Sequence, residues 1–127
     1  MIVLDASALL ALIKDEAGAD VVARAAGSDD ATISAVNYAE TLQKAARAGV
    51  AVEDVDVALE ALGITVSPFG RLDARLAASF YRHQSKLSLA DRVCLALARS
   101  LSSVAFTADR AWEVWADELG VTVRVIR

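Results

Sequence analysis

Short apolar runs alternate with longer stretches of helical periodicity along the whole chain. Four runs do not alternate with polar residues, which is typical of strands buried on both faces of a parallel sheet. These runs are Ile2–Leu4, Ala31–Ile33, Ile64–Val66 and Val104–Phe106. A fifth run, Val121–Ile126, alternates valine with Thr122 and Arg124 and therefore predicts an edge strand with one solvent-facing side.

Helices are predicted between these strands. Their expected ranges are Ser7–Lys14, Ala17–Ala26, Ala35–Ala48, Val52–Leu62, Leu72–Ser85, Leu89–Ser100 and Arg110–Leu119. Strands that alternate with helices indicate a layered α/β fold. The length of 127 residues fits one domain, and no linker or repeat divides it, so residues 1–127 are predicted to form a single domain.

Composition narrows the class of protein. Hydrophobic residues make up 56% of the chain, yet no apolar run approaches the roughly 20 residues of a membrane-spanning helix. The first residues, Met1–Asp5, lack the basic segment of a signal peptide. The single cysteine, Cys94, excludes an intramolecular disulfide and fits a reducing compartment. We therefore expect a soluble cytoplasmic protein.

The net charge of −4 argues against a protein that coats nucleic acid, because such proteins are usually basic. The charge is unevenly distributed, however. Residues 71–99 contain six basic and two acidic residues, a local charge of +4. Such asymmetry is consistent with one positive face, although for any single arginine a solvated helix surface is the simpler interpretation.

Four acidic residues occupy similar places in this pattern. Asp5, Asp91 and Asp109 fall where an apolar run gives way to a helix or in the first turn of that helix, and Glu40 lies one to two turns into the helix after Ala31–Ser34. In a parallel sheet such junctions share the edge at the carboxyl ends of the strands, where ligands bind. Converging carboxylates repel one another unless a cation lies among them, and oxygen ligands suit Mg²⁺ or Mn²⁺. The pattern predicts a metal-dependent enzyme that acts on phosphates.

Each acid also has a structural interpretation. Asp5 and Asp109 are suited to cap helices, Asp91 fits a capping box that begins at Ser88, and Glu40 fits an exposed helix position. Capping and metal binding are compatible, because a helix N-terminus itself favours a carboxylate.

Two hydroxyl residues accompany the acids. Ser7 and Thr107 each lie two positions from an acid, where they would hydrogen-bond a ligating carboxylate or simply cap a helix; both interpretations remain open.

Other chemistries find little support. His83 has no partner for nucleophilic catalysis and is predicted on the surface, and Cys94 is predicted as a small buried hydrophobe. A haloacid-dehalogenase-like phosphatase needs Asp-x-Asp after its first strand, but Ser7 stands at the second position. A receiver domain needs an aspartate at the end of its third strand, and residues 65–69 contain none.

The ordered segments around the four acids resemble those of PIN-domain ribonucleases, and specifically VapC-type toxins of bacterial toxin–antitoxin pairs. The matching segments, in order, are Val3–Ala8, Ser34–Glu40, Leu87–Asp91 and Phe106–Arg110. No single segment is specific, but the set in this order is. The resemblance implies a three-layer α/β/α PIN-like fold with a central, mainly parallel sheet of about five strands.

The resemblance also implies an activity and partners. It implies a Mg²⁺- or Mn²⁺-dependent endoribonuclease that forms a homodimer and is inhibited by a small, VapB-like antitoxin. Asp5 and Asp91 would be the principal metal ligands, and Glu40 and Asp109 would complete the site directly or through water.

Two further interpretations stay open. Arg92 and Arg110, which directly follow two of the acids, are weaker candidates for phosphate binding. The alternative function is a non-catalytic RNA- or protein-binding module that retains a PIN-like acidic pocket.

Overall fold

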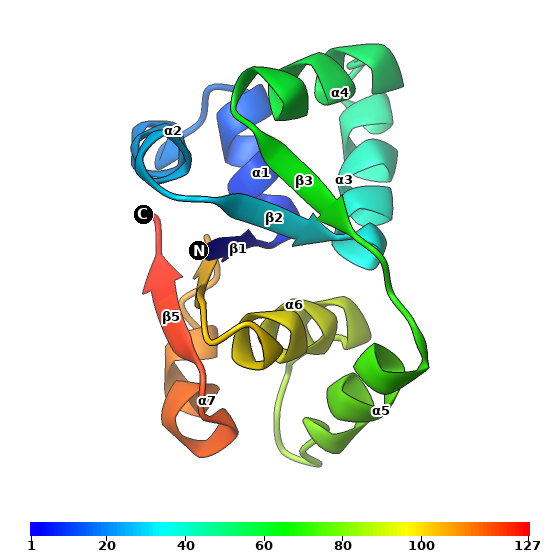
Figure 1. Cartoon of the computed structure of the whole chain (residues 1–127), viewed down its shortest axis with the longest axis vertical. Helices are drawn as coiled ribbons and strands as arrows, with labels where there is room; N and C mark the ends of the chain where they lie inside the picture. Colours follow the sequence, from blue (N-terminus) through cyan, green and yellow to red (C-terminus); the bar gives the residue numbers. More distant parts are fainter.

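The structure is a computed structural model that describes residues 1–127 (Figure 1). Five strands and seven helices follow one another along the chain. In order they are β1 (Ile2–Leu4), α1 (Ala6–Ile13), α2 (Ala19–Ser28), β2 (Ala31–Ser34), α3 (Ala35–Arg47), α4 (Val52–Ala61), β3 (Ile64–Ser67), α5 (Arg71–Ser79), α6 (Leu89–Ser100), β4 (Val104–Thr107), α7 (Trp112–Leu119) and β5 (Thr122–Val125). All five predicted strands and all seven predicted helices are present.

The strands form one sheet in the order β3-β2-β1-β4-β5, and every neighbouring pair is parallel. The predicted sheet is confirmed and is parallel throughout. β5 lies at one edge, as its alternating pattern predicts. β3 lies at the other edge and leaves Thr65 and Val66 exposed, so the prediction that it is buried on both faces was wrong. A strand of four residues is too short for its pattern to distinguish an edge from the interior.

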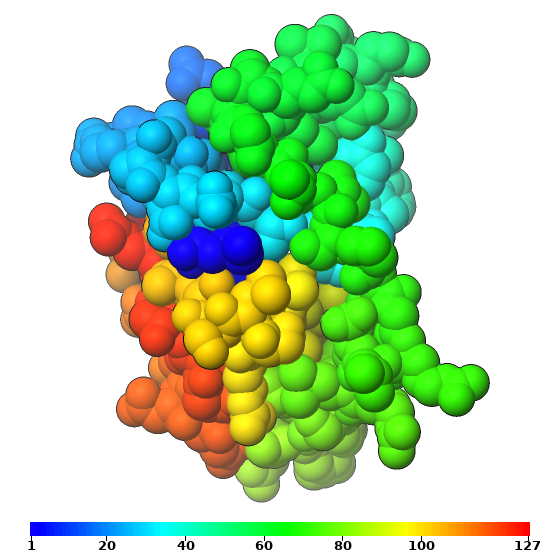
Figure 2. Space-filling model, in the orientation of Figure 1, coloured from blue at the N-terminus to red at the C-terminus, as the bar shows by residue number.

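Helices cover both faces of the sheet and create two cores (Figure 1). One core joins α1, α2, α3 and α4 to the sheet and includes Leu9, Val22 and Ile33; the other joins α5, α6 and α7 and includes Phe80, Leu95 and Trp112. Figure 2 shows a blue-to-green half above and a yellow-green-to-red half below, with the N-terminus between them. The three-layer α/β/α arrangement is confirmed.

Helix α5 is shorter than the predicted range Leu72–Ser85, because it ends at Ser79. Phe80 turns into the core, and the guanidinium of Arg82 donates to the carbonyls of Ser79 and Tyr81. These contacts satisfy carbonyls that a longer helix would have used internally. His83 is exposed, as expected, but it lies in the connection to α6 rather than on a helix.

Helix α7 begins at Trp112, two residues later than predicted. Asp109 holds the preceding turn, because its Oδ1 accepts from the amide of Ala111 at 2.9 Å. Trp112 is fully buried in the core that α5, α6 and α7 share.

The topology brings the predicted acidic positions to one edge of the sheet. β1 and β4 are adjacent and parallel, with Leu4 opposite Phe106, so Asp5 and the segment Thr107–Asp109 leave the sheet side by side. α3 begins directly after β2, the other neighbour of β1, and α6 lies against α3. No helix is both long and apolar enough to cross a membrane.

Candidate acidic active site

Asp5 is the most enclosed of the four acids, with 5% of its surface exposed. It is the N-cap of α1, and its Oδ1 accepts from the amide of Ala8 at 2.8 Å. Burial raises the pKa of Asp5 to about 6, although hydrogen bonds from Thr107, Ser7 and Ala8 oppose that rise. The predicted capping role is therefore confirmed. The carboxylate is held in a buried position that disfavours its charged form.

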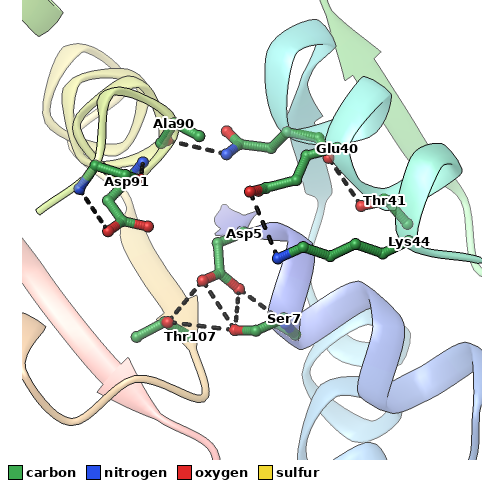
Figure 3. A network of polar contacts seen from close by, with 11 residues as sticks. Asp5, Ser7, Glu40, Thr41, Lys44, Ala90, Asp91 and Thr107 are labelled. Carbon is green, nitrogen blue, oxygen red and sulfur yellow. Dashed lines mark hydrogen bonds and ion pairs between the residues drawn. The ribbon is translucent and has the colours of Figure 1, made fainter.

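Ser7, in the first turn of α1, and Thr107, at the end of β4, hold Asp5. The Ser7 hydroxyl lies 2.7 and 2.9 Å from the two oxygens of Asp5, and the Thr107 hydroxyl donates to Oδ2 at 2.6 Å (Figure 3). Each hydroxyl also accepts from a backbone amide, Ser7 from Ala108 and Thr107 from Asp109. Thus the two hydroxyls orient Asp5 and also fasten the end of β1 to the end of β4.

Asp91 is half-buried in the first turn of α6 and forms the predicted capping box with Ser88. The amide of Ser88 donates to Asp91 Oδ2 at 2.9 Å, and the amide of Asp91 donates to Ser88 Oγ at 3.1 Å. Burial raises the pKa of Asp91, and the negative charges of Asp109 and Glu40 add to the increase. Both the capping role and the proximity to other acids are therefore visible in the structure.

Glu40 is partly exposed and Asp109 is exposed. Glu40 lies on α3 and forms an ion pair with Lys44 one turn later, with 3.6 Å between Oε2 and Nζ (Figure 3). Asp109 is exposed, and its Oδ1 is bound to the turn before α7. As these side chains are placed, no three of the chain's acidic, histidine or cysteine residues form a group that would hold one metal ion.

The acids are nevertheless electrostatically coupled. The charge of Asp91 contributes to the raised pKa of Asp5, and the charges of Asp109 and Glu40 contribute to that of Asp91. None of Asp5, Asp91 and Asp109 forms an ion pair with a basic side chain. In Figure 3, Asp5, Glu40 and Asp91 reach toward one space from the end of β1, from α3 and from α6. The edge of the sheet thus carries three carboxylates, those of Asp5, Asp91 and Asp109, that have no basic partner.

Asn37 belongs to this neighbourhood, although the sequence did not single it out. It is 1% exposed on α3, and its Nδ2 donates to the carbonyl of Ala90 at 3.0 Å, next to Asp91. Its Oδ1 is buried without a hydrogen-bond partner. The available signal was its spacing three residues before Glu40, which places both side chains on one side of a helix. Similarly, the Glu40–Lys44 spacing of four residues is readable from the sequence.

The sequence also singled out Arg92, Arg110 and Cys94. The guanidinium of Arg92 is directed to α5, where Nη1 donates to the carbonyl of Ala77 at 3.4 Å and the group lies over the ring of Tyr81. Arg110 is exposed beside Asp109. Cys94 is fully buried, and burial raises the pKa of its thiol, with further increases from Asp5, Asp91 and Glu40. The expectation that Cys94 acts as a buried hydrophobe is confirmed.

Comparisons with known proteins show the family of the chain and structures that share its fold. A family model described as the PIN domain matches residues 2–117. Among curated proteins, no sequence relative was found. PIN domains are generally nucleases that use divalent metal ions.

Several solved structures share the fold. A toxin–antitoxin complex from Klebsiella pneumoniae superposes with a TM-score of 0.73 at 19% identity, over 100% of this chain and 98% of that chain. VapC20 of Mycobacterium tuberculosis, described as a toxin that cleaves the sarcin–ricin loop, gives a TM-score of 0.71 at 19% identity over 90% and 94% of the two chains. FitAcB from Neisseria gonorrhoeae gives 0.66 at 24% identity over 97% and 96%.

The family match covers most of the chain. The chain therefore belongs to the PIN domain family.

Proposed function

We propose that this protein is a Mg²⁺- or Mn²⁺-dependent endoribonuclease, the toxin of a toxin–antitoxin pair. The observation that carries the proposal is the uncompensated charge at Asp5. This carboxylate is nearly buried, has a pKa raised to about 6, and is coupled to Asp91 without any basic partner. A protein maintains such an arrangement against its electrostatic cost when a cation or a reacting group is to be bound there.

The residues present fit a divalent cation. Their donors are carboxylate oxygens, which Mg²⁺ and Mn²⁺ favour. Asp5 and Asp91 would hold the ion, with Glu40 and Asp109 contributing directly or through water. Bound there, the ion would supply an activated water and would neutralise charge that develops on the phosphate.

The chain's own residues prepare the site for this chemistry. Ser7 and Thr107 fix the orientation of Asp5, and Ser88 fixes that of Asp91, so little reorganisation of these two ligands is required. Glu40 is partly exposed and Asp109 is exposed, and both are suited to orient a water molecule as a base. Glu40 is held by its ion pair with Lys44, and Asp109 by the amide of Ala111. Either acid can exchange this contact for a new partner.

Substrate and partners follow from the family and from the charge of the site. We propose RNA as the substrate and a small antitoxin as the inhibitor in the cytoplasm, because a free nuclease of this kind must be restrained. A basic side chain of the antitoxin that entered the acidic site would pair with its carboxylates and compete with the metal.

We also propose a homodimer. Large apolar side chains on α5 and at the start of α6, Leu72 and Leu89, are 77% and 59% exposed and are available for such an interface.

Incubation of the purified protein with total cellular RNA tests the activity. We expect discrete fragments with Mg²⁺ or Mn²⁺ and none with EDTA. Intact RNA under all metal conditions, together with retained RNA or protein binding, would establish the alternative, a non-catalytic binding module with a PIN-like pocket.

A further inference from the structure

A groove of about 460 Å³ lies between α1 and α3, beside the acidic site. Three of its five lining residues are basic: Lys14 at the end of α1, and Lys44 and Arg47 on the last turns of α3. Its remaining lining residues are Leu10 and Ala48. The groove is therefore a concentration of positive charge on a protein whose net charge is −4.

The groove is continuous with the acidic site through one ion pair. Lys44 lines the groove and also lies 3.6 Å from Glu40, whose charge acts on Asp91. Figure 3 shows Lys44 extended along α3 toward Glu40, with α1 below it. The ion pairs of Lys44 with Glu40 and of Lys14 with Glu16 are both partly exposed, so they are weak and readily exchanged for other anions.

A second hollow, of about 250 Å³, borders the acidic site on the side of Asp109. Its wall is mainly apolar and includes Leu87, Val114 and Trp115, with Lys86 and Gln84 beside them. Val114 is 77% exposed although it is apolar. An aromatic side chain next to a basic one suits an unpaired base and its phosphate.

We propose that a single strand of RNA crosses the carboxyl edge of the sheet between these two features. Its phosphates lie along Lys14, Lys44 and Arg47 on one side, and an unpaired base rests against Leu87, Val114 and Trp115 on the other. The two features flank the acidic site, because Lys44 of the groove pairs with Glu40 and Asp109 lines the hollow. This inference rests on the proposed nuclease function and adds the path of the substrate.

The charge of the acidic site makes such a path necessary. Four carboxylates repel a phosphate backbone, so binding energy must come from cations outside the catalytic set. Lys14, Lys44 and Arg47 supply it from rigid helices, while the cations of Arg92 and Arg82 are engaged with Ala77 and Glu118. A protein ligand would find only Leu10 and Ala48 as apolar anchors in the groove, so a polyanion is favoured as its occupant.

Binding of a fluorescent single-stranded RNA in EDTA tests the groove without reliance on cleavage. The parent for this measurement is the Asp5→Asn protein, and the triple variant adds Lys14→Gln, Lys44→Gln and Arg47→Gln. The control adds Arg24→Gln, Arg124→Gln and Arg127→Gln, which remove the same charge from exposed residues on α2, β5 and the C-terminus. We expect the groove variant to bind at least about tenfold more weakly than the control, with a slope of log K against log salt shallower by about 2.

The hollow is tested by Val114→Asp, with Val57→Asp as its control, because Val57 is 64% exposed on α4. We expect Val114→Asp, and not Val57→Asp, to weaken RNA binding. The loss of affinity should be smaller for an oligonucleotide that lacks bases than for intact RNA.

Equal RNA affinity and equal salt slope for the groove and control variants overturn the proposed path. The same holds if the groove variant keeps its RNA affinity but loses a copurifying protein partner, because the groove is then a protein-docking face. These results leave the proposed nuclease standing if the wild-type protein cleaves RNA. A parent protein that does not bind RNA, together with a wild-type protein that does not cleave it, overturns both proposals.

Discussion

The hydroxyl of Thr107, at the end of β4, donates a 2.6 Å hydrogen bond to Oδ2 of Asp5, at the end of β1, across 102 positions of sequence. The same hydroxyl accepts from the amide of Asp109. One buried side chain thus connects the most enclosed acid of the site to the loop that carries another. This connection follows from the pairing of β1 with β4, and it gives Thr107 a role in both stability and electrostatics.

Thr107→Val should raise the pKa of Asp5 above about 6, because the lost hydrogen bond favours the charged carboxylate. It should also lower the free energy of unfolding by about 1–3 kcal/mol, since buried polar groups lose their partner. Carbon-detected NMR titration and urea denaturation measure the two effects. Thr107→Ser, which retains a hydroxyl, should change the pKa much less. An unchanged pKa in the valine variant would refute the assigned role.

In the absence of metal, Asp5→Asn should be more stable relative to wild type at neutral pH than at acidic pH. The folded pKa of Asp5, about 6, lies above its ordinary value of 3.8, so the wild type loses stability as the pH rises through this interval. A difference of about two pKa units corresponds to about 3 kcal/mol. The variant's free energy of unfolding, relative to wild type, should therefore rise by up to about 3 kcal/mol between pH 3.5 and pH 7.5. Denaturation in EDTA at both pH values measures this change, and parallel pH profiles for the two proteins would argue against it.

Mn²⁺ or Mg²⁺ should raise the melting temperature of the wild type, because a ligand of the folded state stabilises it by mass action. The shift should disappear in Asp91→Asn and should fade as the pH falls below about 6, where Asp5 becomes protonated. Calorimetric titration of concentrated protein provides an independent check. If neither ion binds, the site is not a metal centre.

Asn37→Ala should lower the free energy of unfolding by about 1–3 kcal/mol, because the carbonyl of Ala90 loses its donor. It should also weaken metal binding, since that carbonyl lies in the turn that positions Asp91. Gln43→Ala, at an exposed position on the same helix, is the matched control and should do neither. Normal metal affinity in Asn37→Ala would limit the role of Asn37 to stability.

Much of the fold was predictable because local and global signals agree. Apolar runs locate the strands, and the rule that parallel strands end at one edge places Asp5 and Asp109 together from the sequence alone. The Ser88–Asp91 capping box was equally visible, because it is contained in four consecutive residues. These features depend on chemistry within a few positions or on a general rule of topology.

The features that escaped prediction depend on contacts between distant residues. The end of α5 is set by burial of Phe80 and by Arg82, whose Nε also pairs with Glu118 on α7 at 2.7 Å. The buried bond from Asn37 to Ala90 joins two helices whose packing the sequence does not specify. The order of strands, which placed β3 at an edge, is likewise a property of the assembled sheet.

Single-turnover cleavage of RNA by matched variants tests the central claim most directly. Wild type, Asp5→Asn, Asp91→Asn and Asp117→Asn are compared at equal Mn²⁺ concentration, each with its melting temperature measured beforehand. Asp117 is an exposed acid on α7, so its variant controls for the loss of one carboxylate. The account predicts that Asp5→Asn and Asp91→Asn lose at least about 100-fold in rate while folded, as expected when a ligand of a catalytic metal is removed, and that Asp117→Asn cleaves like wild type. Wild-type rates in folded Asp5→Asn and Asp91→Asn would contradict it.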